Sequence, residues 1–365
     1  MAVDLTQISN VDAEPGELPA TMAAWVIRQE REGEPVDAFQ IEEIEVPEPA
    51  AFEVIVRVMA AGVNFNNVWA ALGKPVSVFR YHPNEDHHIG GSDASGVVWK
   101  VGPGVTRWQP GDEVVIHCNQ ASYGLTYFTA YRMLLDRVKL QAGHRVLIWG
   151  AAVGLGVFAT QLCKAAGAQA AGVVSSPEKG ALVEQLGATG WIDRNEFAGM
   201  MRRGDETPDE EKARFAVSRD FSKRVREILG EPPDIVFEHV GRATFPTSVF
   251  VVKPFGKVVI CGATSGYTLD FDVRYLWMRQ KEILGSHFAN AWQCNLANKL
   301  IESGQIKPVL GRTIGFDQGA EAHQLMHENK HLGKIAILVG ATDEGQGRTA
   351  PTPSEPAAIR AEVGA

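Results

Sequence analysis

The stretch HRVLIWGAAVGLGVFATQLCKAAGAQAAGVVSS, residues 144–176, decides the fold of this chain. It predicts a buried strand, a glycine-rich turn, an amphipathic helix and a second buried strand, in that order. The apolar segments DIVFEHVG (234–241) and GKVVICGAT (256–264) add further strands. Apolar strands that alternate with helices indicate a parallel sheet with helices on both faces, so we expect an α/β, doubly wound fold.

The rest of the chain follows a different pattern. From Met22 to about Gln120, short apolar runs are interrupted by Gly and Pro, which is typical of a β-rich module. This β-like character returns after Gly266. We therefore expect a flexible arm over 1–20, a discontinuous catalytic domain over 21–126 and 268–340, a nucleotide-binding domain over 127–267, and a disordered tail over 341–365.

Composition excludes several classes of protein. The 365-residue chain has a formal net charge of −9, with 45% hydrophobic and 22% charged residues. These values argue against a nucleic-acid-binding protein, which usually carries a basic surface. No apolar run is long enough to cross a bilayer, and the N-terminus lacks the basic start and apolar core of a signal peptide. We expect a cytoplasmic protein with no membrane partner.

The sequence does not favour a metal site. Its four cysteines are dispersed and form no C-x-x-C pair, which favours reduced thiols in the core. They are Cys118, Cys163, Cys261 and Cys294. The segment DHH (86–88) is the other candidate, but side chains on adjacent residues diverge, and a surface loop is the simpler interpretation.

The glycine-rich turn after the first buried strand predicts a nucleotide site of the Rossmann type. Such a turn lets backbone N–H groups approach a pyrophosphate at the positive end of the helix dipole. The spacing G-x-x-x-G-x-G differs from the usual G-x-G-x-x-G, and a tight strand–helix packing turn is the alternative. The predicted cofactor-binding residues are Gly150, Ala151, Val153, Gly154, Leu155 and Gly156, with Gly262 and Thr264 after a later strand.

The end of the next strand, GVVSSPEK (172–179), indicates which dinucleotide binds. An NAD site usually ends this strand with an acidic residue that binds the ribose hydroxyls. Here Ser175, Ser176 and Lys179 stand at that place, and Arg194 can add a second cation. Hydroxyl groups and cations suit a 2′-phosphate, so we predict NADPH as the cofactor.

A cluster of amides lies in GVNFNNVWAALGKPVS (62–77), where Asn64, Asn66 and Asn67 surround one aromatic residue. Asparagine is poor in strands and favours turns, so turn chemistry explains the cluster in part. The alternative is a dry pocket that binds a neutral polar molecule, because amides donate and accept hydrogen bonds without carrying charge.

The order of the modules resembles the medium-chain dehydrogenase/reductase superfamily, whose catalytic domain is GroES-like, and the lack of ligand cysteines implies a zinc-free member. Eight segments resemble one family within it, the crotonyl-CoA carboxylase/reductases. They are AAGVNFNNVWA, HIGGSDASGVVWKVG, GDEVVIHCNQ, TAYRML, VVSSPEK, FEHVGRATFP, FDVRYLWMRQK and GSHFAN. The resemblance extends from about Pro19 to Val339.

The resemblance implies NADPH-driven reduction of crotonyl-CoA or a related 2-enoyl-CoA, with capture of CO2 to give a substituted malonyl-CoA such as ethylmalonyl-CoA. The family's CO2-binding asparagine matches Asn66 or Asn64, and we favour Asn66. Its pocket histidine matches His287. The resemblance also implies a homo-oligomer, expected to be a tetramer.

For three further residues, the sequence leaves two interpretations open. Arg274 and Tyr275 match a family motif for the CoA side and the subunit contact, while a surface ion pair is the alternative. His239 follows a parallel strand near where cofactors bind, but a packing role fits equally well.

The chain departs from the family at Gln120–Ala121. The family has roughly fifty further residues there, far more than an ordinary loop, and they include part of the CO2 pocket and a strand of the catalytic domain. Either the segment is missing from the sequence record or the protein lacks it. If the protein lacks it, we expect a reductase that carboxylates poorly. Two rival functions remain: a simple enoyl-CoA or quinone reductase, and an NADPH-binding subunit without catalysis.

Overall fold

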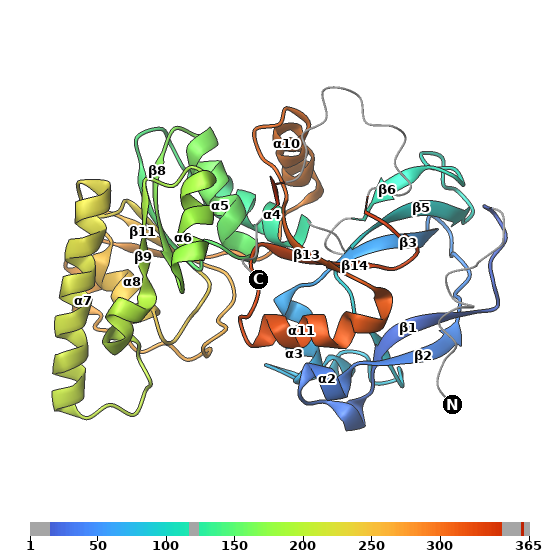
Figure 1. Cartoon of the computed structure of the whole chain (residues 1–365), viewed down its shortest axis with the longest axis horizontal. Coiled ribbons are helices and arrows are strands. Elements are labelled where there is room, and N and C mark those ends of the chain that lie inside the picture. Colours follow the sequence, from blue (N-terminus) through green and yellow to red (C-terminus); the bar gives the residue numbers. More distant parts are fainter. Residues whose placement is uncertain (1–14, 117–123, 345–358, 361–365) are drawn as a thin grey trace. The chain divides into compact units, whose positions relative to one another are not determined.

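The computed structural model describes residues 15–116, 124–344 and 359–360 (Figure 1). Two compact units are present. Of the described residues, the first contains those up to Leu125 and those from Leu310 to 344, and the second contains Thr126–Val309 and Ile359–Arg360. The chain therefore returns to the first unit later than residue 268, where the sequence indicated the return.

The second unit is built on a parallel sheet of six strands in the order β12-β11-β10-β7-β8-β9. The strands are β7 (Arg145–Trp149), β8 (Gln169–Val174), β9 (Gly190–Asp193), β10 (Ile235–Glu238), β11 (Lys257–Ile260) and β12 (Glu282–Gly285). The four residues of β10 are all buried, which explains the apolar run of Ile235, Val236 and Phe237. The expected α/β, doubly wound sheet is confirmed.

The helical segments of this unit begin before β7 and then alternate with the strands along most of the chain. They are α4 (Gly124–Tyr131), the π-helical η3 (Arg132–Arg137), α5 (Gly154–Ala165), α6 (Pro177–Gln185), the 3-10 turn η4 (Arg194–Met200), α7 (Pro208–Leu229), α8 (Phe245–Val251), α9 (Arg274–Trp277) and α10 (Ala291–Glu302). The helix α7 begins with a capping box of Thr207 and Glu210 and ends at Gly230 with φ +79°. Its inner face packs on the sheet, because Phe221 stacks on Trp149 with ring centroids 5.3 Å apart.

Strand β12 explains the late return to the first unit. It pairs in parallel with β11, from Lys257↔Glu282 to Ile260↔Gly285. Apolar residues such as Ile283 and Leu284 occur both in strands of β-rich catalytic domains and in strands of parallel sheets. Their composition therefore does not indicate which strand β12 pairs with.

The first unit contains two sheets. One includes the order β13-β14-β3-β5-β6, and the other has the order β2-β1-β4. The strands are β1 (Thr21–Ile27), β2 (Gln40–Glu45), β3 (Val54–Gly62), β4 (His88–Ile89), β5 (Asp93–Val101), β6 (Glu113–Val115), β13 (Val309–Ile314) and β14 (Lys334–Leu338). The helical segments are η1 (Gln29–Arg31), α2 (Pro35–Ala38), α3 (Phe65–Ala71), η2 (Val78–Arg80), η5 (Phe316–Gln318) and α11 (Gly319–His327). A short strand, β15 (Ile359–Arg360), lies within the segment expected to be a disordered tail.

Strand β6 ends the larger sheet of the first unit. In the described part of the chain it pairs with β5 alone, and Val115 at its end is 52% exposed. If a strand beside β6 were lost, an apolar residue at the new sheet edge would become exposed in this way. The junction Gln120–Ala121 itself lies outside the described residues.

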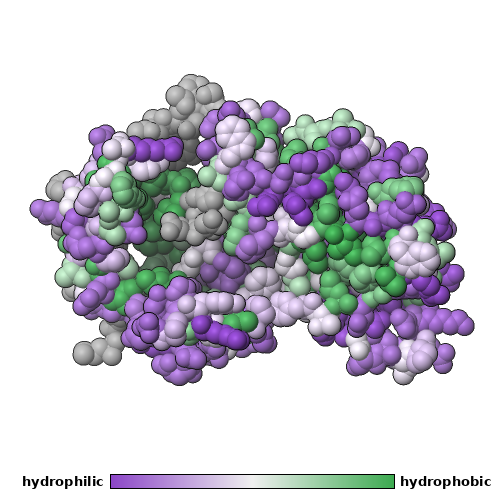
Figure 2. Space-filling model, turned by 180° about the vertical axis from the view of Figure 1, so that it is seen from behind, coloured by the Kyte–Doolittle hydropathy of each residue, from purple (hydrophilic) through white to green (hydrophobic). Residues whose placement is uncertain are grey.

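Part of the expected N-terminal arm contacts β5. The N–H of Gly16 donates to the carbonyl of Trp99 at 2.6 Å, and the Trp99 indole donates to the carbonyl of Glu17 at 2.7 Å. Hydrophobic surface gathers in patches between hydrophilic areas on the face shown in Figure 2. Across the described residues, no helix combines the length and apolar character needed to span a membrane.

Candidate active site

The glycine turn lies between β7 and α5, as the sequence predicts. Gly150 has φ +57° and Gly154 has φ +38°, a region that L side chains rarely adopt. A Cβ atom on Gly156 would lie 2.2 Å from the carbonyl oxygen of Gly150. The N-cap residue of α5 is Val153, whose side chain cannot accept a hydrogen bond from the first turn. The turn can therefore present backbone N–H groups to an anion.

His239 lies against this turn from the end of β10. Its Nε2 atom donates to the carbonyl of Trp149 at 2.8 Å, and its ring would lie 2.9 Å from a Cβ on Gly150. Burial lowers the pKa of His239, so the ring is neutral near physiological pH. The structure thus brings His239 and Gly150 together through packing, which the sequence left open.

The end of β8 carries the predicted hydroxyl and cationic groups. Ser176 caps α6 by accepting from the N–H of Lys179 at 3.4 Å, and the side chain of Asn195 donates to the carbonyl of Ser175 at 2.9 Å. Burial and the nearby charge of Arg194 lower the pKa of Lys179. Both cations therefore lie within electrostatic reach of one another at the strand end.

One acidic residue also lies at this strand end. Glu178 is exposed, and a hydrogen bond with Ser176 lowers its pKa. It stands in the first turn of α6, on the far side of Pro177 from the strand. The acid is thus displaced from the position that ends the strand in an NAD site.

A buried carboxylate orders the loop after β10, and the sequence analysis missed it. Glu238 is fully buried and accepts from the N–H groups of Val240 (2.7 Å) and Gly241 (3.3 Å). The hydroxyls of Thr244 (2.8 Å) and Ser248 (2.7 Å) also donate to it. Burial raises its pKa despite these four donors. An acid inside the apolar run IVFE was the available signal, since buried charges are rare.

Gly262 and Thr264 follow β11, beside that loop. Gly262 has φ +79°, and the N–H of Thr264 reaches the carbonyl of His239 at 3.5 Å. Both residues are exposed. The residues predicted to bind the cofactor thus follow the carboxyl ends of β7, β8, β9, β10 and β11, which is the edge where nucleotides bind in such sheets.

His287 lies in the segment that follows β12. Two arginines of η3 donate to the backbone of this segment: Arg137 to the carbonyl of Gly285 at 3.0 Å, and Arg132 to the carbonyl of His287 at 3.4 Å. The imidazole is exposed, and its ring centroid lies 4.0 Å from that of Phe288. The backbone contacts leave the ring itself available for a ligand.

Arg274 and Tyr275 begin α9 and differ in their surroundings. Arg274 is an exposed residue that pairs with Asp272 at 2.7 Å, which is the surface ion pair considered as the alternative. Tyr275 packs between Phe215 and Phe250, with ring centroids 5.8 Å and 5.2 Å away. Neither contact by itself reveals a CoA site.

The three asparagines of the segment 62–77 differ in their contacts. Asn64 is buried, donates to the carbonyl of Gly62 at 3.2 Å and accepts from Lys334 at 2.6 Å. Asn67 is also buried, and its amide lies between His323 (3.3 Å) and Ser92 (3.5 Å). Both residues therefore have protein partners at each end of the amide.

Asn66 is the exception. It is half-buried, and its Nδ2 atom donates to the hydroxyl of Ser92. Its Oδ1 atom is buried without a protein hydrogen-bond partner. A buried carbonyl oxygen without a partner costs about 1–3 kcal/mol, so this group is a candidate for contact with a ligand.

A buried ion pair supports the asparagine segment. The Lys334 ammonium donates to Asp93 (3.0 Å), Asn64 (2.6 Å) and the carbonyl of Val63 (2.9 Å), which uses all three of its hydrogens. The side chains of Lys334 and Asp93 are 9% and 1% exposed. A lysine at the start of the apolar strand KIAIL was the available signal for this pair.

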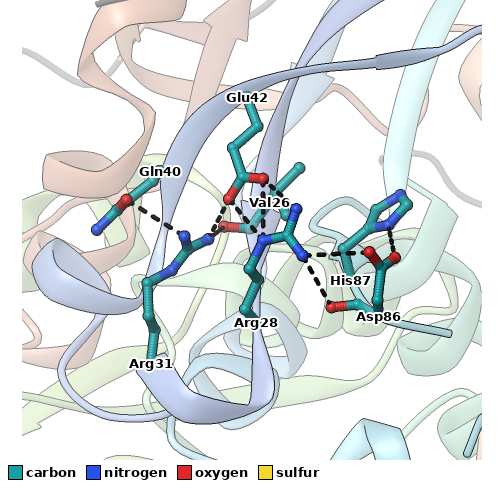
Figure 3. A network of polar contacts seen from close by, with 7 residues as sticks. All are labelled: Val26, Arg28, Arg31, Gln40, Glu42, Asp86 and His87. Carbon is teal, nitrogen blue, oxygen red and sulfur yellow. Dashed lines mark hydrogen bonds and ion pairs between the residues drawn. The ribbon is translucent and has the colours of Figure 1, made fainter. Parts of the chain in front are cut away.

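The segment DHH belongs to an ion-pair network (Figure 3). Glu42 of β2 binds the guanidinium groups of Arg28 and Arg31, each at 2.6 Å. Arg28 also reaches Asp86 at 3.3 Å, and His87 binds the same carboxylate at 2.6 Å. The network ties β1, β2 and the segment before β4 together. Among the described residues, no group of three or more His, Cys, Asp or Glu side chains is placed to hold a metal ion.

Two family models match the chain in succession. The model described as alcohol dehydrogenase GroES-like domain matches residues 50–178, and the one described as zinc-binding dehydrogenase matches residues 154–303. These models agree with a catalytic domain followed by a nucleotide-binding domain.

Individual curated proteins and solved structures are similar to this chain over most of its length. A protein named crotonyl-CoA carboxylase/reductase, from Cereibacter sphaeroides, is 41% identical, with 90% of each chain covered. The solved structure of crotonyl-CoA carboxylase/reductase AntE in complex with NADP is 40% identical, with a TM-score of 0.83, covering 92% of this chain and 98% of that one. The 2-octenoyl-CoA carboxylase reductase CinF, solved with NADP and 2-octenoyl-CoA, is 33% identical, with a TM-score of 0.83, covering 92% and 91%.

The alignment with the Cereibacter protein also bears on the missing segment. It spans 389 positions, more than the whole of this 365-residue chain, yet includes only 90% of it. The relative therefore has residues that have no counterpart here.

Proposed function

Because the chain belongs to the crotonyl-CoA carboxylase/reductase family, we propose that it catalyses the NADPH-dependent reductive carboxylation of crotonyl-CoA or a related 2-enoyl-CoA. The product is an alkylmalonyl-CoA such as ethylmalonyl-CoA. When bound, NADPH supplies the hydride that adds to the β-carbon of the thioester. The resulting enolate attacks CO2 through its α-carbon, and it is protonated instead if water or an acid stands there.

The second unit supplies the groups that hold the cofactor. The turn Gly150–Gly156 offers backbone N–H groups to the pyrophosphate, and Ser175, Ser176, Lys179 and Arg194 offer hydroxyls and cations to the 2′-phosphate. The close approach of Gly156 to Gly150 supports this assignment, because a side chain there would fill the turn.

Asn66 is the residue we propose for CO2. Its Oδ1 atom lacks a protein partner, and only one hydrogen of its Nδ2 is used by Ser92. The second N–H can donate to a CO2 oxygen without offering an acidic proton to the enolate. Asn64 is a weaker candidate, since Lys334 and the backbone hold its amide.

The remaining assignments rest on the family motifs. We propose that His287 lies in the substrate pocket and that Arg274 and Tyr275 contribute to the CoA side. We also propose a homotetramer, for which the exposed apolar residues Val273, Trp277 and Met278 on and beside α9 provide surface. The reduced state of Cys163, Cys261 and Cys294 supports a cytoplasmic location.

A simple enoyl-CoA or quinone reductase is the second candidate. The observation that favours it is the exposed edge at Val115, together with the residues of the relative that this chain lacks. Without that segment water can reach the enolate, and protonation replaces carboxylation.

The test is product analysis with purified chain, NADPH, crotonyl-CoA and ¹³C-bicarbonate. We expect ¹³C-labelled ethylmalonyl-CoA as the main product. Butyryl-CoA as the main product at saturating CO2 would establish the simple reductase instead. NADPH binding without oxidation by any enoyl-CoA would indicate a non-catalytic subunit.

A further inference from the structure

A hydrogen-bonded chain of side chains leads to Asn66 from a backbone carbonyl on α11. The carbonyl of Gly319 lies 2.7 Å from Nδ1 of His323, one turn along the helix. A carbonyl oxygen can only accept, so the Nδ1 atom must carry the hydrogen. This contact determines the direction of every bond that follows.

The ring of His323 carries no second hydrogen. His323 is 4% exposed and stacks on Phe39 with centroids 4.5 Å apart. Burial is the main cause that lowers the pKa of His323 to about 4. The charge of Lys334 adds to this lowering, and the hydrogen bond with Gly319 acts in the opposite direction. Lys334 is the charged group that affects this ring. The neutral ring therefore presents Nε2 as an acceptor.

The acceptor on His323 orients the amide of Asn67. The group that faces Nε2 at 3.3 Å must be the Nδ2 donor, which turns Oδ1 toward Ser92. The hydroxyl of Ser92 then donates to that oxygen at 3.5 Å. Since the hydrogen of Ser92 is used there, its oxygen can only accept from Asn66.

The last bond decides which end of the Asn66 amide is held. Nδ2 of Asn66 must face Ser92, so Oδ1 takes the opposite side, where it has no protein partner. A primary amide is nearly symmetric in shape, and without such a chain it could turn by 180° about its last torsion. The end of the amide that carries the second N–H of Asn66 is thus set by the carbonyl of Gly319, four hydrogen bonds away.

We propose that His323, Asn67 and Ser92 are positioning residues that set the orientation of the Asn66 amide and thereby the carboxylation selectivity of the enzyme. The proposal rests on the proposed function for its effect on CO2, but the polarity of the chain rests only on the contacts and on the burial of the His323 ring. Turning of the Asn66 amide would replace its free N–H with its oxygen, and the oxygen repels the oxygens of CO2.

The catalytic test uses Ser92→Ala, with Ser92→Thr as the variant that restores a hydroxyl. We expect the ratio of ethylmalonyl-CoA to butyryl-CoA to fall by about 3- to 10-fold in Ser92→Ala, the effect of one hydrogen bond, and to recover in Ser92→Thr. The matched control is Ser218→Ala, which removes another buried serine hydroxyl, 3.1 Å from Thr247. A product ratio in Ser92→Ala equal to that of the wild type overturns the proposal.

A second measurement does not depend on activity. In a ¹⁵N NMR spectrum of histidine-labelled protein, we expect His323 as the neutral Nδ1–H tautomer at pH 7, with its signal assigned from its loss in His323→Gln. An Nε2–H tautomer or an imidazolium ion would reverse the chain and overturn the proposal. If the wild type reduces crotonyl-CoA without carboxylation, the proposed function fails, and the tautomer alone still decides whether the chain has this polarity.

Discussion

The Nε2 atom of His323 lies 3.3 Å from the side-chain nitrogen of Asn67, across 256 residues of sequence. The two residues belong to α11 and α3, which lie side by side in the first unit (Figure 1). This contact exists only while the ring is neutral, because an imidazolium has no acceptor.

Stability should therefore fall in mild acid. The pKa of His323 is about 4 in the folded chain and near the ordinary 6.5 when unfolded. Between these values the unfolded state binds more protons, so the free energy of unfolding decreases as pH falls. From pH 7 to pH 5 we expect wild type to lose about 2 kcal/mol more than His323→Gln. Urea unfolding at both pH values measures this difference.

His87→Gln provides the control for that comparison. His87 is a partly exposed histidine of the ion-pair network in Figure 3. Its replacement removes an imidazole that takes no part in the contacts of His323, so an effect shared by both variants is not specific to His323. An equal pH dependence in wild type and His323→Gln would contradict the expected role of burial.

Loss of the buried ammonium should destabilise the first unit. In Lys334→Met the carboxylate of Asp93 stays buried without its partner, which costs about 3–5 kcal/mol. Chemical denaturation measures this loss, and Lys334→Met combined with Asp93→Asn should recover part of it. The exposed pair Lys330–Glu328, at 2.6 Å, is the control. Lys330→Met should cost less than about 1 kcal/mol, and a similar cost for both lysines would refute the argument.

A single methyl group should disable the glycine turn. In Gly156→Ala the new Cβ meets backbone atoms of Gly150 and Ala151 at 2.2 Å and 2.5 Å, and backbone cannot move aside as a side chain can. We expect the affinity for NADPH, measured by fluorescence titration, to fall at least about tenfold. Gly285→Ala is the control, since no atom lies within 4 Å of its Cβ. Unchanged NADPH affinity in Gly156→Ala would exclude the turn as the pyrophosphate site.

Removal of a cation at the end of β8 should change the preference between cofactors. Lys179→Ala should raise KM for NADPH by about 10- to 100-fold, the effect of a charge-assisted hydrogen bond, and leave KM for NADH unchanged. Steady-state kinetics with both cofactors measures this. Lys223→Ala removes a charge from the exposed face of α7 and should alter neither KM. An equal rise in KM for NADH would indicate damage to the fold rather than loss of a 2′-phosphate contact.

The parts of the structure that the sequence predicted are local. The turn Gly150–Gly156 and the strand end Ser175–Lys179 each lie within one short stretch, where strand, glycine and hydroxyl patterns are visible together. Helix α7 shows the same kind of local signal, because Phe221, Val225 and Ile228 recur at helical spacing.

What the sequence did not predict depends on distant partners. Lys334 and Asp93 are 241 residues apart, and the lysine in the apolar strand KIAIL signals a buried charge without identifying Asp93 as its partner. Ser92 and His323 belong to no functional motif in the sequence, and their contacts with Asn67 arise only from the fold. Strand β12 was assigned to the wrong unit because pairing with β11 depends on topology, which local composition does not encode.

The pair Lys334–Asp93 has a consequence for the divergence of this chain. A mutation of either residue alone leaves an uncompensated charge in the interior, so the two positions can change safely only together. Single-nucleotide changes rarely achieve that, and each intermediate would be purged when its stability falls below the threshold for folding. The pair should therefore persist in descendants even where the substrate changes, and the two positions should covary in any lineage that has lost them.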